Sequence, residues 1–344
     1  MHSVLSYFRA YFSPDGDAPR GNCSAGQIAQ HLYAALRELG TVCYLDADAQ
    51  PRGLTAEFFV GHFWSFARTA RANRFARNVV LYAIADPGYR ARALAPIVEA
   101  TGLGEPAWDA PPPHFDHDET MERADVVLLV GNSFTRATFA PRWRSKIRLL
   151  NYSVDATLFH PAADARREFC YPATHCGLRK GFYDVLETWS GIDARVTRLH
   201  AVGQLEPAWR ARLDSRNNGS IVHHGYLDSR SAPYRDLLRS CRFAYIPTVV
   251  EGQMGTALEA IFSGCVPITT RASGLDDAVL EHCIVVEPGD VDAHRDAIAT
   301  MLAWSDDTWR ARRGALLAVA HERQSWDVFR ATLLETAAES ACAR

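Results

Sequence analysis

A chain of 344 residues is longer than one ordinary hydrophobic core requires and fits two α/β domains of about 150 residues each. Hydrophobic residues make up 48% of the chain and charged residues 22%, a balance typical of soluble globular proteins that argues against a disordered or membrane-embedded chain. The formal net charge of −3 gives no global field that would attract nucleic acid or an anionic membrane, so we expect no nucleic-acid partner.

The N-terminal segment, residues 1–17, has neither an uninterrupted apolar region nor a small-residue cleavage site, so we expect no signal peptide. No run of about 18 apolar residues occurs anywhere, so we expect no transmembrane segment, and peripheral membrane contact stays open. The eight cysteines have neither the paired spacing of a zinc site nor the density of a disulfide scaffold. These features predict a cytoplasmic protein with reduced thiols.

The first half of the chain alternates short β-rich segments with helix-like segments. We expect strands at 3–8, 41–45, 57–61, 78–85 and 124–131. Residues 25–39 place apolar side chains at helical spacing from Ile28 to Leu39, and Gly40 follows as a C-terminal stop.

The second half repeats this arrangement. We expect strands at 195–203, 220–225, 243–247, 266–270 and 283–288, and helices at 231–241, 255–264 and 325–340. Such alternation predicts an α/β fold with two Rossmann-like domains, whose parallel sheets are covered by helices and face each other across a cleft.

The polar, proline-containing segment 151–166 predicts the boundary between the two domains. We place the N-terminal domain at 1–155 and the C-terminal domain at 156–320. Residues 321–344 form a C-terminal helical segment whose docking partner the sequence leaves open.

A long proline-rich loop at 102–120 interrupts the alternation. It carries His114, Asp116, His117 and Asp118, which invite comparison with a metal site. Adjacent side chains on a loop point in different directions, however, and a metal site needs ligands that converge. We therefore expect no metal here.

The segment 246–274 concentrates the chemistry of the second half. A strand is expected to end at Pro247, and a helix to begin near Gly255. The first amides of that helix, near Thr256 and Ala257, would have no partner within the helix. Together with the helix dipole they predict an anion site suited to a diphosphate.

Two glutamates lie beside this helix start. Glu259, one turn into the helix, could accept hydrogen bonds from ribose hydroxyls, and Glu251, on the preceding loop, could hold hydroxyls of a bound sugar. They form an E-x7-E pattern, and the whole segment resembles that of retaining glycosyltransferases of family 4, which have the GT-B fold. Segments similar to three other landmarks of that family follow in the expected order at 124–139, 151–161 and 177–189.

The resemblance implies a hexosyltransferase-type enzyme with a nucleoside-diphosphate sugar as co-substrate and no metal or other cofactor. Lys180 would contact the diphosphate and offset the charge of the leaving group, while Glu251 would bind the donor sugar and Glu259 the ribose. The other donor-site candidates are Gly203, Gly252, Gln253, Met254, Gly255 and Thr256.

The chain departs from the family at two positions. Where members carry an Arg before the Lys, this chain has Thr174, and either Arg179 or His175 is expected to supply the second positive charge. Arg179 could equally be a solvated residue at the start of a helix.

The second departure concerns a His near the reacting carbon, where this chain has Ala85 and Asp86. Asp86 could take a polar role toward the acceptor or simply start the next turn before Pro87. His62 is the other candidate, since a His after a strand can act as a base or bind a hydroxyl. A structural His beside Phe63 is the alternative.

The loop 12–26 is expected to follow the first strand and to face the cleft. Its candidates for lining the cleft are Asn22, Cys23 and Ser24, and Ser24 could also cap the following helix.

The sequence therefore predicts a retaining, metal-independent glycosyltransferase whose acceptor is a glycan, a lipid-linked molecule or a small molecule. Two alternatives stay open: a GT-B relative with other chemistry, such as a nucleotide-sugar epimerase or an inverting transferase, and a non-catalytic nucleotide-sugar-binding protein.

Overall fold

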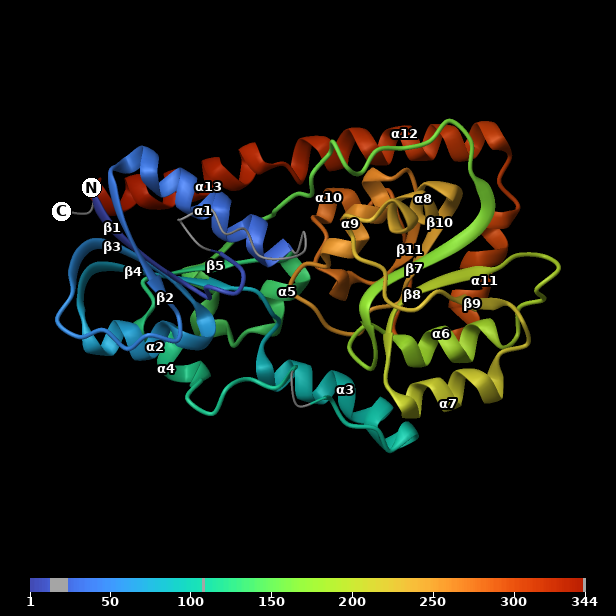
Figure 1. Ribbon diagram of the computed structural model, residues 1–344, viewed down its shortest axis with the longest axis horizontal. Coiled ribbons are helices and arrows are strands. Elements are labelled where there is room, and N and C mark those ends of the chain that lie inside the picture. The colour runs from blue at the N-terminus through green and yellow to red at the C-terminus, as the bar shows by residue number, and fades with distance from the viewer. Residues whose placement is uncertain (13–23, 107–108, 343–344) are drawn as a thin grey trace.

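The computed structural model describes residues 1–12, 24–106 and 109–342, and it shows two α/β domains side by side (Figure 1). The candidates Asn22 and Cys23 lie outside the described residues. Each domain is built around a six-stranded sheet in which every pair of neighbouring strands is parallel. The expected fold class is confirmed.

The sheet of the first domain has the order β2-β1-β3-β4-β5-β6. Its strands are β1 (His2–Tyr7), β2 (Thr41–Asp46), β3 (Thr55–His62), β4 (Arg74–Tyr82), β5 (Val126–Leu129) and β6 (Ile147–Leu149). Its helices are α1 (Ser24–Leu39), α2 (Phe63–Ala72), α3 (Pro87–Thr101), α4 (His117–Arg123), α5 (Ser133–Thr138) and the 3-10 helix η2 (Pro141–Lys146). All four residues of β5 are buried apolar side chains, as expected for a strand covered on both faces.

The sheet of the second domain has the order β12-β11-β10-β7-β8-β9. Its strands are β7 (Arg166–Cys176), β8 (Leu199–Leu205), β9 (Ile221–His223), β10 (Cys241–Ile246), β11 (Val266–Thr269) and β12 (Ile284–Val285). Its helices are α6 (Phe182–Trp189), α7 (Pro207–Arg216), α8 (Ala232–Ser240), α9 (Gly255–Phe262), the 3-10 helix η3 (Arg271–Ser273), α10 (Asp277–Leu280), α11 (Val291–Leu302) and α12 (Asp306–Arg323).

The central strand β7 was not among the expected strands. It begins with two arginines and contains Pro172, which cannot donate a hydrogen bond to a neighbouring strand. The register explains how the proline is tolerated: β7 pairs with β10 only as far as Cys170, and its pairing with β8 is irregular between Pro172 and His175. The last part of β7 therefore leaves one neighbour and turns toward the loop that carries Lys180.

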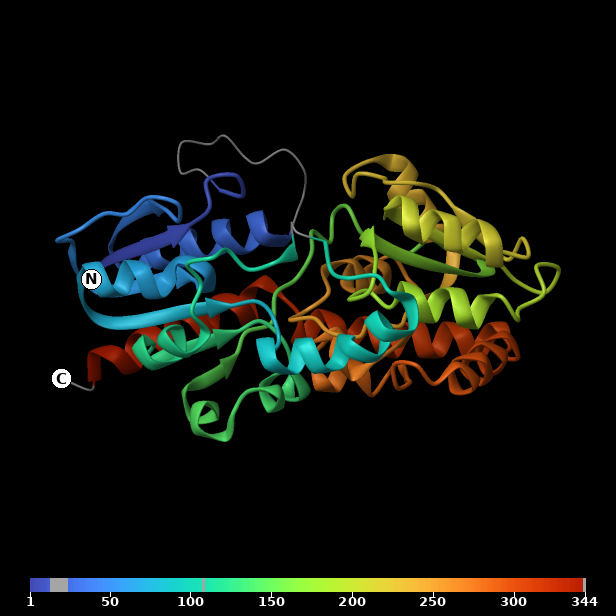
Figure 2. The ribbon, with the colours of Figure 1, turned by 90° about the horizontal axis from the view of Figure 1, so that it is seen from below.

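The last helix, α13 (Trp326–Cys342), supplies the docking partner that the sequence left open. After α12 the chain returns to the first domain, where α13 packs along α1 (Figures 1 and 2). The His31 and Trp326 rings stack with centroids 3.8 Å apart, and Arg330 Nε donates to Glu38 Oε1 over 2.7 Å. Among the described residues the chain thus joins the two domains twice, through residues 150–165 and through the turn between α12 and α13.

Direct contacts also hold the domains together. Asn132, which caps α5 in the first domain, donates its amide to the carbonyls of Arg271 and Leu275 in the second, at 3.0 and 2.9 Å. Ser133 Oγ donates to Asp277 Oδ1 over 2.9 Å. None of the described helices is both long and apolar enough to cross a lipid bilayer.

Candidate functional site

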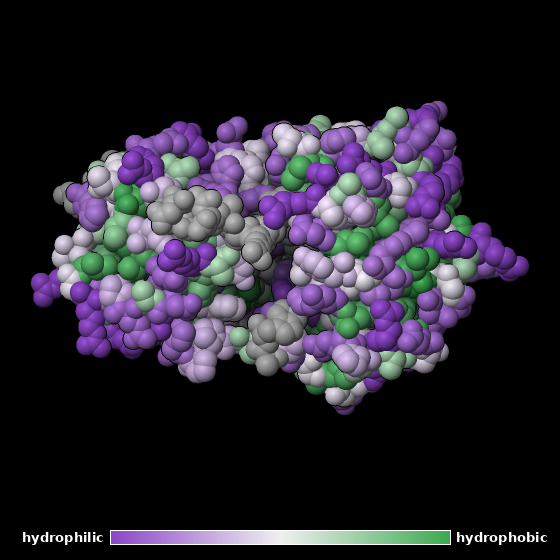
Figure 3. All heavy atoms as spheres, in the orientation of Figure 1, coloured by the Kyte–Doolittle hydropathy of each residue, from purple (hydrophilic) through white to green (hydrophobic). Residues whose placement is uncertain are grey.

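A cavity of about 300 Å³ opens between the two domains. It lies where the loop after β7, the loop after β9 and the start of α9 meet, with Ser24 of α1 contributing from the first domain. Figure 3 shows the surface hollowed between the two halves, with hydrophilic side chains around the opening. Among the sequence candidates that line the cavity are Ser24, Arg179, Lys180, Glu251, Gln253, Gly255, Thr256 and Glu259.

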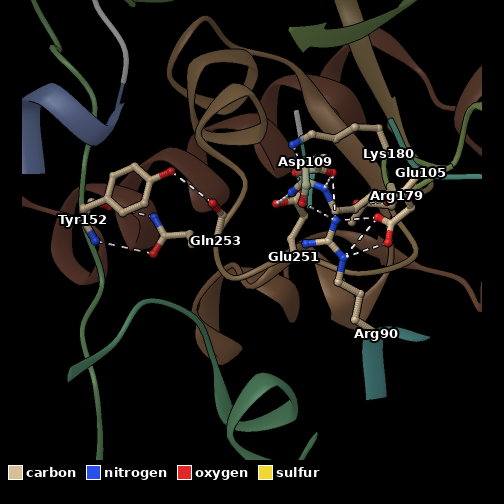
Figure 4. A network of polar contacts seen from close by, with 9 residues as sticks. Arg90, Glu105, Asp109, Tyr152, Arg179, Lys180, Glu251 and Gln253 are labelled. Atoms are coloured by element: carbon tan, nitrogen blue, oxygen red, sulfur yellow. Dashed lines mark hydrogen bonds and ion pairs between the residues drawn. The ribbon is translucent and has the colours of Figure 1, made fainter. Parts of the chain in front are cut away.

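Glu251 forms ion pairs with two cations of the cavity wall, Lys180 and Arg179 (Figure 4). Its Oε1 lies 2.6 Å from Lys180 Nζ, and its Oε2 lies 2.6 Å from Arg179 Nη1. The Glu251 side chain is only 7% exposed, and although burial alone would raise the pKa of its carboxyl, the two cations hold that pKa below its ordinary value. Glu251 is therefore an anion between two cations.

The backbone fixes Arg179 and Lys180 beside the loop of Glu251. Thr248 Oγ1 and the amide of Val249 both donate to the Arg179 carbonyl, at 3.0 and 2.9 Å. Gly181 has φ 71°, and a Cβ there would lie 1.8 Å from the carbonyl oxygen of Pro247. Only glycine fits this position, which explains why a Lys-Gly pair precedes α6.

Arg179 is the positive charge that shares Glu251 with Lys180. His175 lines a smaller cavity of about 140 Å³, whose wall also includes Arg179 and Lys180, and burial lowers the pKa of its imidazole. Thr174, at the position of the family's Arg, lines the larger cavity without a charge.

The ion pairs continue into the first domain (Figure 4). Asp109 Oδ2 lies 2.9 Å from Arg179 Nε and also 2.9 Å from Arg90 Nη2. Arg90 belongs to α3, and its Nε donates to Glu105 over 3.1 Å. A chain of alternating charges thus connects a helix of the first domain with Glu251 of the second.

The start of α9 has no side-chain cap among the described residues. The Thr256 hydroxyl is buried there, lines the cavity, and has no hydrogen-bond partner in the described part of the chain. The amide of Ala257, which was expected to be free, instead donates to the Met254 carbonyl over 3.1 Å, and that of Met254 donates to Ser273. Fewer amides than expected are therefore available to an anion at the start of α9.

Gln253 is hydrogen-bonded to Tyr152 of the segment that connects the two domains. Its side-chain Nε2 donates to the Tyr152 carbonyl over 3.0 Å, and the Tyr152 hydroxyl donates back to the Gln253 carbonyl over 3.1 Å (Figure 4). Gln253 therefore fixes the cavity floor to the interdomain segment.

Glu259 is buried one turn into α9 and is 7% exposed. Its Oε2 accepts a hydrogen bond from the Tyr234 hydroxyl over 2.6 Å, and burial raises the pKa of its carboxyl from 4.5 to about 7. Near neutral pH this side chain therefore exists in both protonation states.

This pKa predicts how stability depends on pH. A Glu that titrates near 4.5 in the unfolded chain and near 7 in the folded one makes the native state bind more protons between these values, so its contribution to stability falls as pH rises through that window. At pH 8 we expect the free energy of unfolding of Glu259→Gln, measured by urea denaturation, to exceed that of wild type by on the order of 3 kcal/mol. The variant should also lose less stability between pH 5 and pH 8. Exposed Glu322, changed to Gln, is the control, and an unaltered pH dependence in Glu259→Gln would contradict the assignment.

Gly252 places the second domain directly against the first. A Cβ on Gly252 would lie 2.3 Å from the carbonyl oxygen of Ala83 and 2.8 Å from that of Val130, which follow β4 and β5. Only a glycine allows this approach.

Gly252→Ala is therefore expected to hold the domains apart by roughly 1 Å and to lower kcat/KM by about 100-fold. A Cβ at Gly314, on α12, would meet nothing within 4 Å, so Gly314→Ala should retain full activity. Steady-state kinetics of both variants, with their melting curves, would check this, and normal kcat/KM in Gly252→Ala would show that the close approach is dispensable.

His62 lies among aromatic rings at the end of β3. Its ring centroid is 4.9 Å from that of Phe8 and 5.3 Å from that of Tyr7, and its Nδ1 accepts the Trp64 amide at the start of α2. Burial lowers the pKa of its imidazole to about 3, so the ring is neutral. His62 does not line the cavity of Glu251, and it serves here as a helix cap.

Asp86 caps α3, accepting the Tyr89 amide at 2.9 Å, and its Oδ2 lies 3.3 Å from His117 Nε2. Burial alone would raise the pKa of Asp86, but the hydrogen bonds from His117 and from the Tyr89 amide hold it below its ordinary value. The other His117 nitrogen lies 2.8 Å from the Tyr82 hydroxyl. The structure does not bring Asp86 into the cavity.

Gly203 likewise lies outside the cavity. Its amide donates to the Gly225 carbonyl over 2.9 Å, and a Cβ there would lie 2.7 Å from Cys176 Sγ. It allows β8 to pack closely against β7.

Sequence reasoning missed Tyr234 and other residues of the cavity wall, among them Tyr226 and Asp228, and it missed the ion-paired Arg90 and Asp109 beside the cavity. Asp109 and Arg90 reach Arg179 only through the long loop and α3, and no local spacing signals such a contact. The burial of Tyr234 could have been predicted from the sequence, because the residue lies on the buried side of the expected helix 231–241.

Comparison with known proteins gives one family match. Residues 167–303 match the model of the family described as glycosyl transferases group 1. No curated protein matches the sequence.

Solved structures match over the whole chain at low sequence identity. Sucrose-phosphate synthase from Thermosynechococcus elongatus has a TM-score of 0.69 and 17% identity, covering 100% of both chains. The E. coli structure described as trehalose-6-phosphate bound with UDP-2-fluoro glucose has a TM-score of 0.66 and 10% identity, covering 98% of each chain. Anabaena HepE in complex with UDP and glucose has a TM-score of 0.66 and 10% identity, covering 98% of this chain and 100% of that one.

At these identities the solved structures show the fold, while the family match concerns the sequence of the second domain. The resemblance inferred from the sequence is confirmed in this form. The family match and the fold together show a glycosyltransferase of GT-B architecture, in which residues 167–303 match the group 1 model.

Proposed function

We propose that this protein transfers a sugar from a nucleoside-diphosphate sugar to an acceptor hydroxyl, with retention of anomeric configuration and without a metal ion. The observation that carries the proposal is the contact of Glu251 with both Lys180 and Arg179, in a cavity that also holds Glu259 and the uncapped start of α9. Two of the similar structures contain UDP and glucose or UDP-2-fluoro glucose, which supports a nucleotide-sugar donor.

The donor diphosphate would bind at Lys180, Arg179 and the start of α9. These groups present two positive charges, free helix amides and the Thr256 hydroxyl to one anion. The two side-chain cations supply the charge that a metal ion supplies in other transferases, which is the reason for proposing a metal-independent reaction. Glu251 would then exchange part of its ion pairing for hydroxyls of the donor sugar.

In the reaction, the bond between the anomeric carbon and the diphosphate oxygen breaks, and the electron pair stays on the diphosphate. Lys180 and Arg179 stabilise that growing negative charge, and such preorganised donors act most strongly where water is excluded. The acceptor oxygen bonds to the same face of the sugar, and its proton passes to the departing phosphate oxygen. No protein acid is needed, because the leaving diphosphate is a weak base.

The test is a panel of UDP-, GDP-, ADP- and TDP-sugars. One nucleotide should raise the melting temperature, since a ligand at 100 times its Kd adds about 2.7 kcal/mol of stability. With that donor, NMR of the product should show retained anomeric configuration, and the rate should be unchanged by EDTA. Inverted product, an epimerised donor or binding without turnover would each overturn the proposal in favour of an alternative reaction or a binding protein.

A further inference from the structure

Asp109, in the segment between α3 and α4, is a residue of the first domain that contacts a cation of the second (Figure 4). Its Oδ2 accepts a hydrogen bond from Arg179 Nε over 2.9 Å, and its side chain is 16% exposed. Asp109 lines the smaller cavity of His175 and is not among the described residues that line the cavity of Glu251. It would therefore not touch a donor bound in the cavity of Glu251.

The Arg179 guanidinium is held at two of its nitrogens. Nε donates to Asp109, and Nη1 donates to Glu251 Oε2 over 2.6 Å. A guanidinium is planar and rigid, so two contacts at different nitrogens fix the direction in which the whole group faces. Glu251 alone would hold one corner and leave the plane free to turn. Because a guanidinium has several N–H donors, these two contacts leave others for a further anion.

Arg90 fixes Asp109 in turn to a helix of the first domain. Arg90 Nη2 donates to Asp109 Oδ2 over 2.9 Å and to the Asp109 carbonyl over 3.2 Å. Arg90 lies near the start of α3, which Asp86 caps, and its Nε donates to Glu105. The Asp109 carboxylate is thus anchored to a helix, as is usual for groups that orient the residues of a site.

A carboxylate beside an anion site can orient the cation or compete for it. A competitor would occupy the space that the anion fills. Asp109 approaches Arg179 from outside the cavity of Glu251, so it can keep its contact with Nε while a diphosphate lies in that cavity. The geometry favours orientation over competition.

We propose that Asp109 is a positioning residue, which orients Arg179 toward the diphosphate of the donor. The inference rests on the proposed function, since it concerns the same leaving group. Asp109 belongs to the first domain and Arg179 to the second, so the orientation of Arg179 depends on the two domains lying against each other as they do here. The diphosphate site of the second domain is then completed by the first.

The experiment compares kcat and pyrophosphate affinity in variants of the full chain, with the donor found in the nucleotide screen. Asp109→Ala should lower kcat by about tenfold or more, because Arg179 keeps its charge and loses its orientation toward the leaving group. Pyrophosphate affinity, measured by calorimetry, should not fall, because the variant removes a negative charge near the cavity. Asp109→Asn keeps an oxygen that can accept the Arg179 Nε–H, and it should retain most of kcat.

A double-mutant cycle with Arg179→Ala shows whether Asp109 acts through Arg179. In the Arg179→Ala background, Asp109→Ala should change kcat by less than about twofold. Asp109→Leu removes the acceptor at similar volume and is the second such variant, with melting curves to establish that each variant folds. Asp118→Ala is the matched control, since Asp118 pairs with Arg142 at 3.3 Å on the exposed surface of the first domain and should leave kcat and affinity unchanged.

Four results would each overturn the inference: wild-type or higher kcat in both Asp109→Ala and Asp109→Leu, an equal loss of kcat in Asp109→Asn, a loss of pyrophosphate affinity as large as that of kcat, or additive losses with Arg179→Ala. Absence of sugar transfer by the wild-type protein would overturn the proposed function, and this inference with it. An active wild type beside a fully active Asp109→Ala would overturn the inference alone, so the two failures are distinguishable.

Discussion

Lys180→Ala is expected to lower kcat by about 100- to 1,000-fold, the usual effect of removing one preorganised donor to a developing negative charge. Lys180 Nζ lies 2.6 Å from Glu251 and lines the cavity proposed for the diphosphate. Because its contact strengthens as the leaving group gains charge, kcat should fall more than KM rises. Initial rates with the donor identified by the nucleotide screen would measure both.

The chain offers a matched control for this variant in Lys146. Its Nζ donates to the carbonyls of Met121 and Ala124 in the first domain, at 3.1 and 3.0 Å, and takes no part in the cavity. Lys146→Ala should therefore cost some stability and leave kcat nearly unchanged. A Lys180→Ala enzyme that retains more than a tenth of the wild-type kcat would remove Lys180 from the mechanism.

Glu251→Ala is expected to abolish measurable transfer and, in addition, to destabilise the protein. The substitution leaves the Lys180 and Arg179 cations facing each other, with Asp109 as the carboxylate still paired with Arg179. Breaking a buried ion pair on one side costs about 3–5 kcal/mol, which corresponds to a fall in melting temperature on the order of 10 °C. The ion pairs of Glu251 are thus the reason why stability should fall together with activity.

The double variant Glu251→Ala/Lys180→Ala separates the two effects. Removing one unpaired cation should restore part of the lost melting temperature, while transfer stays abolished. Exposed Glu322, changed to Ala, should leave both quantities at their wild-type values. Additive losses of stability in the double variant would mean that Glu251 and Lys180 are not coupled.

The donor side of the cleft was predictable because its chemistry lies in short segments. Lys180 and Gly181 are adjacent, and Glu251 and Glu259 lie on the loop and first turns of one helix, so the strand-loop-helix pattern alone brings them to one cavity. The pairing of Glu251 with Lys180 was not predicted. It depends on the fit of the loop after β7 against the loop after β10, through the Arg179 carbonyl.

The candidate residues of the first domain were harder to predict, because their contacts do not follow from short sequence segments. His62 and Asp86 follow strands, as catalytic residues of parallel sheets often do, but both side chains cap helices, and burial keeps the His62 ring neutral. The contact of Arg90 with Asp109 crosses 19 positions of the chain through a proline-rich loop that has no periodicity. β7 was missed because its proline is tolerated only where it has left β10.

The scarcity of lysine gives Lys180 a practical use. The chain contains 37 Lys and Arg residues, and only Lys146 and Lys180 are lysines. Burial lowers the pKa of the Lys180 ammonium, which increases its fraction of nucleophilic free amine. Within this sequence, an amine-acylating reagent therefore has two lysine targets, Lys146 and Lys180. The extent of acylation at Lys180, read by peptide mass, becomes a direct measure of whether the diphosphate cavity is filled.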